Sequence, residues 1–158
     1  SIVLPTYNGS KYIRQAIESC LNQTYRQIEL IVVDDCSTDN TPEIIRSFKD
    51  SRVNYIRNEK NQRLPRSLNI GFAAAHNEVI RSTDSEYVCV LNPDCLLEQD
   101  YLYRCVEFLN SHPDVASVTG LLIRVPSLTE RGPCDTVDAY GMHMTPWAHV
   151  KNYRENKQ

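Results

Sequence analysis

The sequence predicts an α/β fold in which a mostly parallel sheet is flanked by helices. Short apolar runs alternate along the chain with longer stretches of helical periodicity, which is typical of strands that alternate with helices. Polar clusters follow three of the apolar runs directly, as they do where parallel strands end at a binding site. Because 158 residues suit one hydrophobic core, we expect a single domain over 1–158.

The first half of the chain is expected to hold three strands and two helices. Apolar runs predict strands over 1–5, 28–33 and 53–56. A helical spacing of apolar residues predicts the first helix, and Thr41-Pro42-Glu43 predicts the start of the second, with Thr41 as N-cap and Pro at the first helical position. The residues that define the first helix are Ile13, Ala16, Ile17, Cys20 and Leu21.

The second half is expected to continue the alternation and then lose it. His112-Pro113 should end the last helix, because the residue before a proline disfavours helical backbone. No periodicity is apparent after Pro126. The expected elements are a helix over 65–80, a buried strand over 87–91, a helix over 99–111, and strands over 115–118 and 121–125.

The composition narrows the class of protein. Hydrophobic residues make up 41% of the chain and charged residues 23%, which is typical of a globular protein. The formal net charge of -3 argues against a nucleic-acid partner. The apolar runs are too short to cross a bilayer, and no secretory leader pattern opens the chain. Because the opening Ser-Ile-Val-Leu-Pro lacks Met and already has strand character, we expect a fragment that begins a few residues late.

Cysteine usage bears on the compartment. The six cysteines form no CxxC pair, so neither a zinc site nor a thioredoxin-like motif has support. Cys20 and Cys105 fall on apolar faces of expected helices, and Cys89 lies within an apolar run. This placement favours reduced thiols over a disulfide scaffold. We therefore expect a cytoplasmic location, with a peripheral position at the inner face of the membrane as an option.

Three polar clusters follow expected strands: Thr6-Tyr7-Asn8, Asp34-Asp35 and Asn92-Pro93-Asp94. Ligands of an open α/β sheet bind outside the carboxyl ends of its strands, so all three clusters should meet at one edge. Each cluster also has a structural interpretation, because tyrosines pack over sheet edges, aspartates cap helices and Asn-Pro-Asp forms turns. Their joint placement favours a binding site.

The side chains suit a nucleoside diphosphate and a divalent cation. Tyr7 can stack on a base. A carboxylate at a strand end can accept a hydrogen bond from the imide N–H of uracil or thymine. Asp94 can hold Mg²⁺ or Mn²⁺, which prefer oxygen ligands. Arg63 and Arg66 are candidates for contacts to the base or the phosphates, although arginines in such loops are more often solvated surface charges.

Several stretches carry a family resemblance. They are Ser-Ile-Val-Leu-Pro-Thr-Tyr-Asn-Gly (1–9), Leu-Asn-Gln-Thr-Tyr (21–25), Ile-Val-Val-Asp-Asp-Cys-Ser-Thr-Asp-Asn-Thr (31–41), Leu-Pro-Arg-Ser-Leu-Asn-Ile-Gly (64–71) and Tyr-Val-Cys-Val-Leu-Asn-Pro-Asp (87–94). Together they resemble family 2 glycosyltransferases of the GT-A fold. The last stretch resembles the variant metal motif of the rhamnosyltransferase-like branch, to which 135–151 is more weakly similar. The resemblance implies a GT-A (Rossmann-like) fold that is truncated before its acceptor half.

The resemblance also implies a role for each matched residue. Tyr7 stacks on the base, Asp35 binds its imide, and Asp34 supports the loop. Asp94 coordinates Mn²⁺ or Mg²⁺, with Asn92 as a second candidate. Ser37 caps the following helix, and Cys36 stands where Gly is usual, which is tolerated if its φ is negative. The implied nucleotide-binding set is Pro5, Thr6, Tyr7, Asn8, Asp34, Asp35, Arg63 and Arg66.

The implied reaction is an inverting transfer of a hexosyl or rhamnosyl group from a UDP- or dTDP-sugar. The acceptor would be a hydroxyl of a glycan or lipid-linked molecule, in polysaccharide or cell-envelope synthesis. The general base is expected beyond residue 158, so no catalytic residue is assigned. The alternative is a non-catalytic or degenerate GT-A-fold fragment with a structural or binding role. Dinucleotide and P-loop enzymes have little support, because G-x-G-x-x-G and G-x-x-x-x-G-K-[ST] are absent.

Overall fold

The computed structural model describes residues 1–59, 81, 83–123, 137–139, 142–144 and 150–152. By its internal packing the chain divides into two compact units, Ser1–Tyr103 and Arg104–Gln158. The expectation of a single domain over 1–158 stays a prediction. The helix expected over 65–80 lies outside the described residues.

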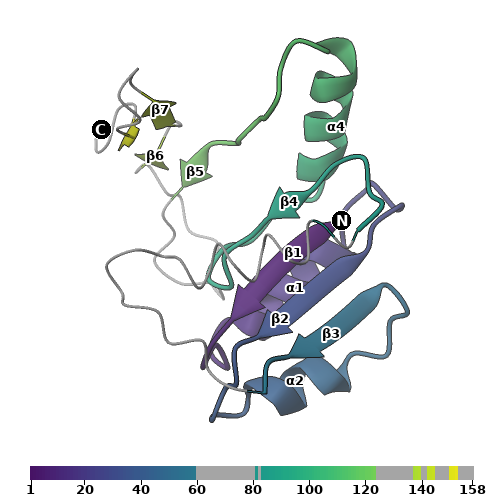
Figure 1. The fold of residues 1–158 in the computed structure, drawn as a ribbon, viewed down its shortest axis with the longest axis vertical. Helices are drawn as coiled ribbons and strands as arrows, with labels where there is room; N and C mark the ends of the chain where they lie inside the picture. Colours follow the sequence, from purple (N-terminus) through teal and green to yellow (C-terminus); the bar gives the residue numbers. More distant parts are fainter. Residues whose placement is uncertain (60–80, 82, 124–136, 140–141, 145–149, 153–158) are drawn as a thin grey trace. The chain divides into compact units, whose positions relative to one another are not determined.

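A four-stranded sheet forms the first unit's centre, and its strand order is β3-β2-β1-β4 (Figure 1). All three strand pairs are parallel, which confirms the predicted α/β class. In the register, Thr6 lies opposite Asp34, and Asp34 lies opposite Arg57. The carboxyl ends of neighbouring strands therefore meet at one edge. The strands are β1 (Ile2–Thr6), β2 (Leu30–Asp34), β3 (Val53–Arg57) and β4 (Cys89–Val90).

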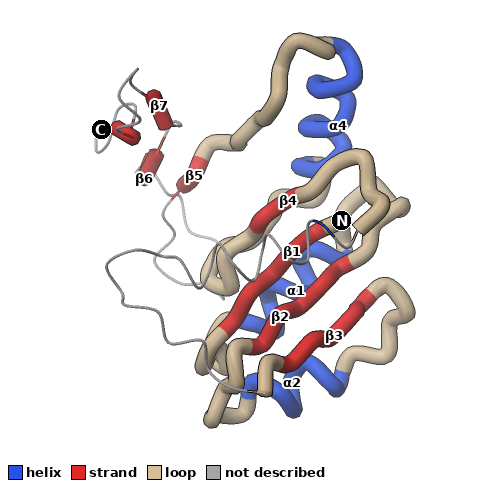
Figure 2. The backbone as a smooth tube through the Cα atoms, in the orientation of Figure 1, coloured by secondary structure: helices blue, strands red, loops and turns tan. Residues whose placement is uncertain are grey.

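Helices α1 (Ile13–Leu21) and α2 (Thr41–Ser47) cover one face of this sheet (Figure 2). Strand side chains point alternately to the two faces, so every second residue of β1 and β2 faces these helices. The other face buries Val3, Ile31 and Val33, with Val88 packed against them. The core on the helical face consists of Ile2, Leu4, Ile13, Ala16, Ile17, Cys20, Leu30, Val32, Ile45, Leu91 and Leu102.

A buried glutamine joins the end of α1 to the segment that follows β4. The Gln23 side chain is 0% exposed, and its Nε2 donates to the carbonyl oxygens of Ser19 (3.1 Å) and Glu98 (2.8 Å). Its Oε1 accepts the backbone N–H of Leu102 at 3.0 Å, at the start of α4 (Tyr101–Ser111). The loop that carries Asp94 is thus held by β4 before it and by Gln23 after it.

The later elements depart from expectation. Residues 115–118 form no strand, and Val118 is 37% exposed. In place of a strand over 121–125, the two residues of β5 (Leu122–Ile123) pair antiparallel with β6 (Val137–Ala139). A further antiparallel pair, β7 (Met142–Met144) and β8 (Val150–Asn152), was not predicted. Short runs such as 115–118 become strands only when a partner completes their hydrogen bonds.

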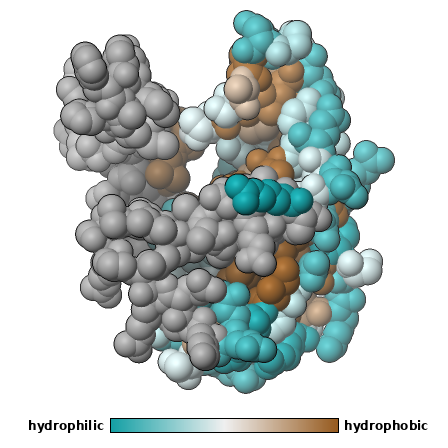
Figure 3. Space-filling view, viewed as in Figure 1, coloured by the Kyte–Doolittle hydropathy of each residue, from teal (hydrophilic) through white to brown (hydrophobic). Residues whose placement is uncertain are grey.

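Helix α4 ends at Ser111, directly before His112-Pro113, as predicted. Apolar atoms gather on its surface in Figure 3, and its Tyr103 and Phe108 side chains are 51% and 41% exposed. Among the described residues, no helix combines the length and hydropathy needed to cross a bilayer. Among the described cysteines, Cys20, Cys36 and Cys95 are free thiols.

Candidate functional site

The three predicted clusters follow the carboxyl ends of β1, β2 and β4. These strands are neighbours in the sheet and run parallel, with β1 between the other two. Leu91 extends the β4 ladder, because its N–H donates to the carbonyl of Val3 at 3.0 Å. The prediction that the clusters meet at one edge of the sheet is therefore confirmed.

The loop after β1 presents an aromatic ring to solvent. Pro5 and Thr6 are buried within the strand, whereas Tyr7 is 47% exposed. Asn8 has a φ of 49°. Its N–H donates to Ser37 Oγ at 2.9 Å, and its Oδ1 accepts the N–H of Thr38 at 2.8 Å. Asn8 thus ties the β1 loop to the β2 loop, and the neighbouring Tyr7 ring is available for stacking.

Asp34 is the last residue of β2 and is 0% exposed. Its Oδ1 accepts the N–H of Ser37, and its Oδ2 accepts the hydroxyl of Tyr55, both at 2.9 Å. Arg57 Nε lies 3.9 Å from the same Oδ2. Burial, followed by the hydrogen bond to Asp34, raises the pKa of Tyr55. With these internal contacts, Asp34 fixes the loop and does not reach outward.

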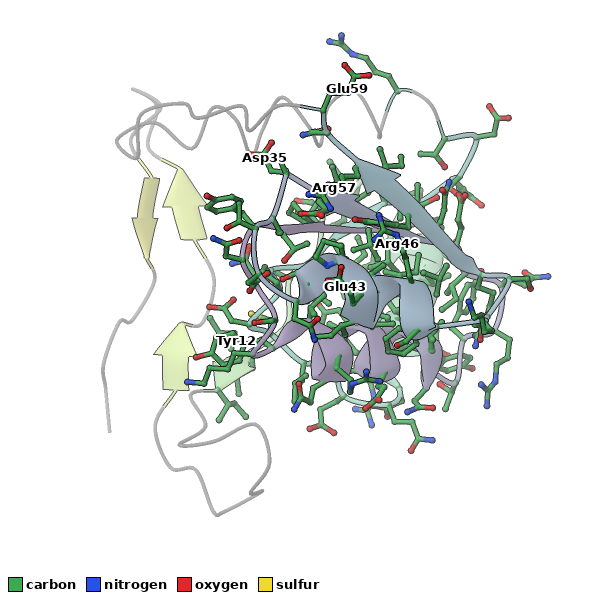
Figure 4. All side chains as sticks on the ribbon, turned by 90° about the horizontal axis from the view of Figure 1, so that it is seen from below. Tyr12, Asp35, Glu43, Arg46, Arg57 and Glu59 are labelled. Atoms are coloured by element: carbon green, nitrogen blue, oxygen red, sulfur yellow. The ribbon has the colours of Figure 1, made fainter. Side chains whose placement is uncertain are left out.

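Asp35 is the next residue and is only half-buried. Its N–H donates to the carbonyl of Thr6 at 2.9 Å, which fixes its backbone against the end of β1. Its Oδ1 accepts a hydrogen bond from Asn58 Nδ2 at 2.9 Å. Figure 4 shows Asp35 beyond the end of β2, at the same end of the sheet as Arg57. The two aspartates of this cluster therefore differ: one is internal, and the other lies at the surface of the site.

The structure departs from what the sequence suggested for this loop. Cys36 has a φ of 63°, so the condition of a negative φ is not met and the residue adopts the left-handed backbone that Gly favours. The prediction that Ser37 caps the following helix is wrong, because the N-cap of α2 is Asn40, and the Ser37 Oγ accepts the N–H of Asn8. Asp39 serves the helix start instead, since its Oδ1 accepts the N–H of Thr41 at 3.0 Å. Thr41 is the first residue of α2 and its N-cap is Asn40, one position earlier than predicted.

Asn92 and Asp94 follow β4, and both side chains are exposed. The N–H of Cys95 donates to the carbonyl of Asn92 at 3.1 Å, so these residues form a turn. Burial and the adjacent Asp94 carboxylate raise the pKa of the Cys95 thiol. Within the described part of the chain, no group of three or more His, Cys, Asp or Glu side chains converges on a metal position. Both exposed side chains carry oxygen atoms, the kind of ligand that hard divalent cations prefer.

The remaining predicted residues, Arg63 and Arg66, lie outside the described residues. Sequence reasoning missed Arg57 and Asn58, at the carboxyl end of β3. Arg57 Nη2 donates to the carbonyl of Ser37 at 2.9 Å, and Asn58 contacts Asp35. Polar residues after the expected strand over 53–56 were not considered; the rule that ligands bind outside the carboxyl ends of parallel strands, applied to β3, would have found both residues.

The chain matches the model of glycosyl transferase family 2 over residues 1–157, and it belongs to this family. The poly-beta-1,6-N-acetyl-D-glucosamine synthase of Staphylococcus epidermidis is 32% identical over 120 residues, which are 76% of this chain and 27% of that protein. The chain spans less than half the length of the curated relatives it matches, for example 41% of one and 45% of another.

Solved structures place the fold among GT-A glycosyltransferases. The structure of S. aureus TarS 1-349 in complex with UDP-GlcNAc has a TM-score of 0.62 and 26% identity, and it covers 89% of this chain and 38% of that one. The mannosyltransferase PcManGT from Pyrobaculum calidifontis, in complex with GDP-Man and Mn2+, has a TM-score of 0.58 and 26% identity. That match covers 68% of this chain and 31% of the other.

Proposed function

We propose that this chain binds a UDP- or dTDP-sugar with a divalent cation and takes part in inverting transfer of the sugar to an acceptor hydroxyl. The observation that carries the proposal is the meeting of three clusters at one sheet edge, with Tyr7 exposed, Asp35 half-buried and Asp94 exposed. These three side chains supply stacking, imide recognition and a cation ligand.

The β1 and β2 loops would hold the nucleotide. Tyr7 would stack on the base, which contributes roughly 1–3 kcal/mol per base in single-strand complexes. Asp35 would accept the imide N–H that uracil and thymine share. Pro5, Thr6, Asn8 and Asp34 would act as the frame, since hydrogen bonds such as the one from the N–H of Thr38 to Asn8 Oδ1 join the two loops to each other. Arg63 and Arg66 stay predicted phosphate or base contacts.

Asp94, with Asn92 as the second candidate, would hold Mn²⁺ or Mg²⁺. A bound cation neutralises charge on the diphosphate as it leaves. The neighbour bound to GDP-Man and Mn2+ supports a cation in this fold. The role of this chain's residues is to hold the cation beside the base site, because β4 lies next to β1 in the sheet.

The finer features of the reaction are proposals of the same kind. The transferred group would be a hexosyl or rhamnosyl unit, and the acceptor a glycan or lipid-linked molecule in polysaccharide or cell-envelope synthesis. The relative named as a polysaccharide synthase supports this setting. Free thiols at Cys20, Cys36 and Cys95 support a reducing, cytoplasmic location, at the inner face of the membrane where a lipid-linked acceptor would lie.

Calorimetric titration tests the proposal. UDP, dTDP, GDP and ADP would each be added to the purified protein with Mn²⁺, with Mg²⁺ and with a chelator. We expect binding of UDP or dTDP that requires the cation and that D35A and D94A each weaken. D84A is the matched control, because Asp84 is exposed and precedes β4, at the opposite end of that strand.

Two outcomes would contradict the proposal. A folded protein that binds none of the nucleotides would support the non-catalytic alternative. Binding that is equally strong with chelator and in D94A would exclude the proposed cation site while leaving the base site in place.

A further inference from the structure

Asn58 makes two contacts with neighbouring residues of the β2 end. Its backbone N–H donates to the carbonyl of Asp34 at 2.9 Å, which extends the pairing of β3 with β2 by one residue. Its side-chain Nδ2 donates to Asp35 Oδ1, also at 2.9 Å. The first contact fixes the Asn58 backbone. Because that backbone is fixed, the second contact restrains the Asp35 carboxylate.

The chemistry of the pair allows one orientation of the amide. A carboxylate only accepts hydrogen bonds, so Asn58 must present its NH₂ group and not its carbonyl oxygen. Both side chains are half-buried. A hydrogen bond to a charged acceptor is stronger than one between neutral groups. The Asn58 amide can therefore restrict rotation of the Asp35 carboxylate without neutralising its charge.

We propose that Asn58 is a positioning residue that holds Asp35 in the orientation selecting a uracil-type base; this inference rests on the proposed function. Uracil and thymine carry a hydrogen on N3 that a carboxylate can accept, whereas the N3 of cytosine is itself an acceptor. A fixed Asp35 carboxylate favours the first kind of base and repels the second. A carboxylate without the Asn58 hydrogen bond is less ordered and loses part of this discrimination, because more of its order must be gained when the nucleotide binds.

The test is the ratio of UDP to CDP affinity in the purified protein, measured by calorimetry with Mn²⁺ present. In N58A, we expect the Kd for UDP to rise about tenfold and the Kd for CDP to stay unchanged, because only UDP uses the positioned carboxylate. N58D keeps the shape of the side chain but places two carboxylates together, so the loss for UDP should be larger. N54A is the matched control, since Asn54 is an exposed residue of the same strand.

A purely structural role predicts a different pattern. Disruption of the loop would weaken UDP and CDP binding equally, and the inference would then be wrong. N58Q retains the NH₂ group and should recover part of the UDP affinity if donation to Asp35 is the function. UDP binding that depends on Asp35 but not on Asn58 would overturn the inference and leave the proposed function standing. No UDP binding by the wild-type protein would overturn both.

Discussion

At the residue scale, two side chains in left-handed backbone shape the loops of the candidate site. Asn8 has a φ of 49° and Cys36 a φ of 63°. Asn is comparatively common in this region, but a β-carbon generally crowds the following carbonyl there. Bonds on either side hold Cys36 in place, since Asp35 N–H donates to Thr6 and Ser37 N–H to Asp34. The loop framework thus determines the backbone of Cys36.

At Gly9 the space for a side chain is limiting, whereas at Asn8 and Cys36 it is the backbone conformation. A β-carbon added there would overlap Thr6 Oγ1, which is buried and has no hydrogen-bond partner among the described residues. The turn after β1 therefore packs directly against the threonine that ends the strand. This close approach is a physical reason for the sequence Thr-Tyr-Asn-Gly at this point of the chain.

Replacing Cys36 tests the backbone strain. We expect C36G to be more stable than C36A by about 1 kcal/mol, because Gly carries no β-carbon in the left-handed region. Urea unfolding of both variants would measure the difference. Cys95 has no positive φ, so there we expect C95A to be more stable than C95G, because the Gly chain gains more conformational entropy on unfolding. Equal stability of C36G and C36A would show that the loop relaxes around the β-carbon.

How far the site could be predicted also depends on individual residues. Tyr7, Asp35 and Asp94 lie within three residues of the end of an apolar run, so local sequence was enough to place them at the sheet edge. The contacts of Ser37 and Asn58 could not be predicted in this way. Ser37 bonds to Asn8 from 29 residues away, and Asn58 bonds to Asp35 from 23 residues away. Such partners are set by strand order and register, which short patterns do not specify.

At the element scale, the start of α2 depends on one carboxylate. Asp39 Oδ1 accepts the N–H of Thr41, and its Oδ2 accepts the N–H of Ser10 at 3.2 Å. Partial burial acts to raise the pKa of Asp39, but the hydrogen bonds from Thr41 and Ser10 outweigh it and lower the pKa from 3.8 to about 2. Asp39 therefore links the α2 start to the loop after β1.

This linkage has a defined dependence on pH. The folded pKa of Asp39 lies below its ordinary value. The stability that its ionised carboxylate contributes to the fold is therefore present above about pH 4 and is lost as the pH falls toward about 2. We expect D39A to lower the free energy of unfolding by about 1 kcal/mol near neutral pH, as loss of a cap does. Urea unfolding across this pH range should show the gap to wild type closing in acid. D84A, the control, should unfold with nearly the same free energy as wild type. A loss of stability in D39A that stays constant with pH would contradict the proposed contribution of the ionised Asp39 carboxylate.

The strands and helices themselves were predicted to different degrees. The runs before Thr6 and Asp34 form strands close to the expected ones, because both are apolar and lie at the centre of the sheet. Of the run over 87–91, only Cys89–Val90 forms the strand β4, and the Leu91 N–H adds one further hydrogen bond to β1. The run over 115–118 has similar composition but remains unpaired. Apolar character therefore predicted the central strands well and the peripheral ones poorly, since the latter depend on a partner.

At the scale of the whole molecule, all predicted site residues that the structure describes belong to one unit. They run from Pro5 to Asp94, within Ser1–Tyr103. The boundary between the units falls between Tyr103 and Arg104, inside α4. A helix is a cooperative element, because each added residue depends on hydrogen bonds to the preceding turn. A boundary inside a helix therefore favours joint unfolding of the two units.

We accordingly expect one unfolding transition for the chain. Trp147 is its single tryptophan and belongs to the second unit, whereas α1 and α2 contribute to far-UV circular dichroism from the first. Urea curves from tryptophan fluorescence and from circular dichroism should coincide if the chain is one cooperative domain. W147F, which should remove the fluorescence change and leave the dichroism curve in place, is the control. Two separated curves would instead make the units independent domains, and UDP with Mn²⁺ should then leave the fluorescence curve unchanged, because the proposed site lies entirely in the first unit.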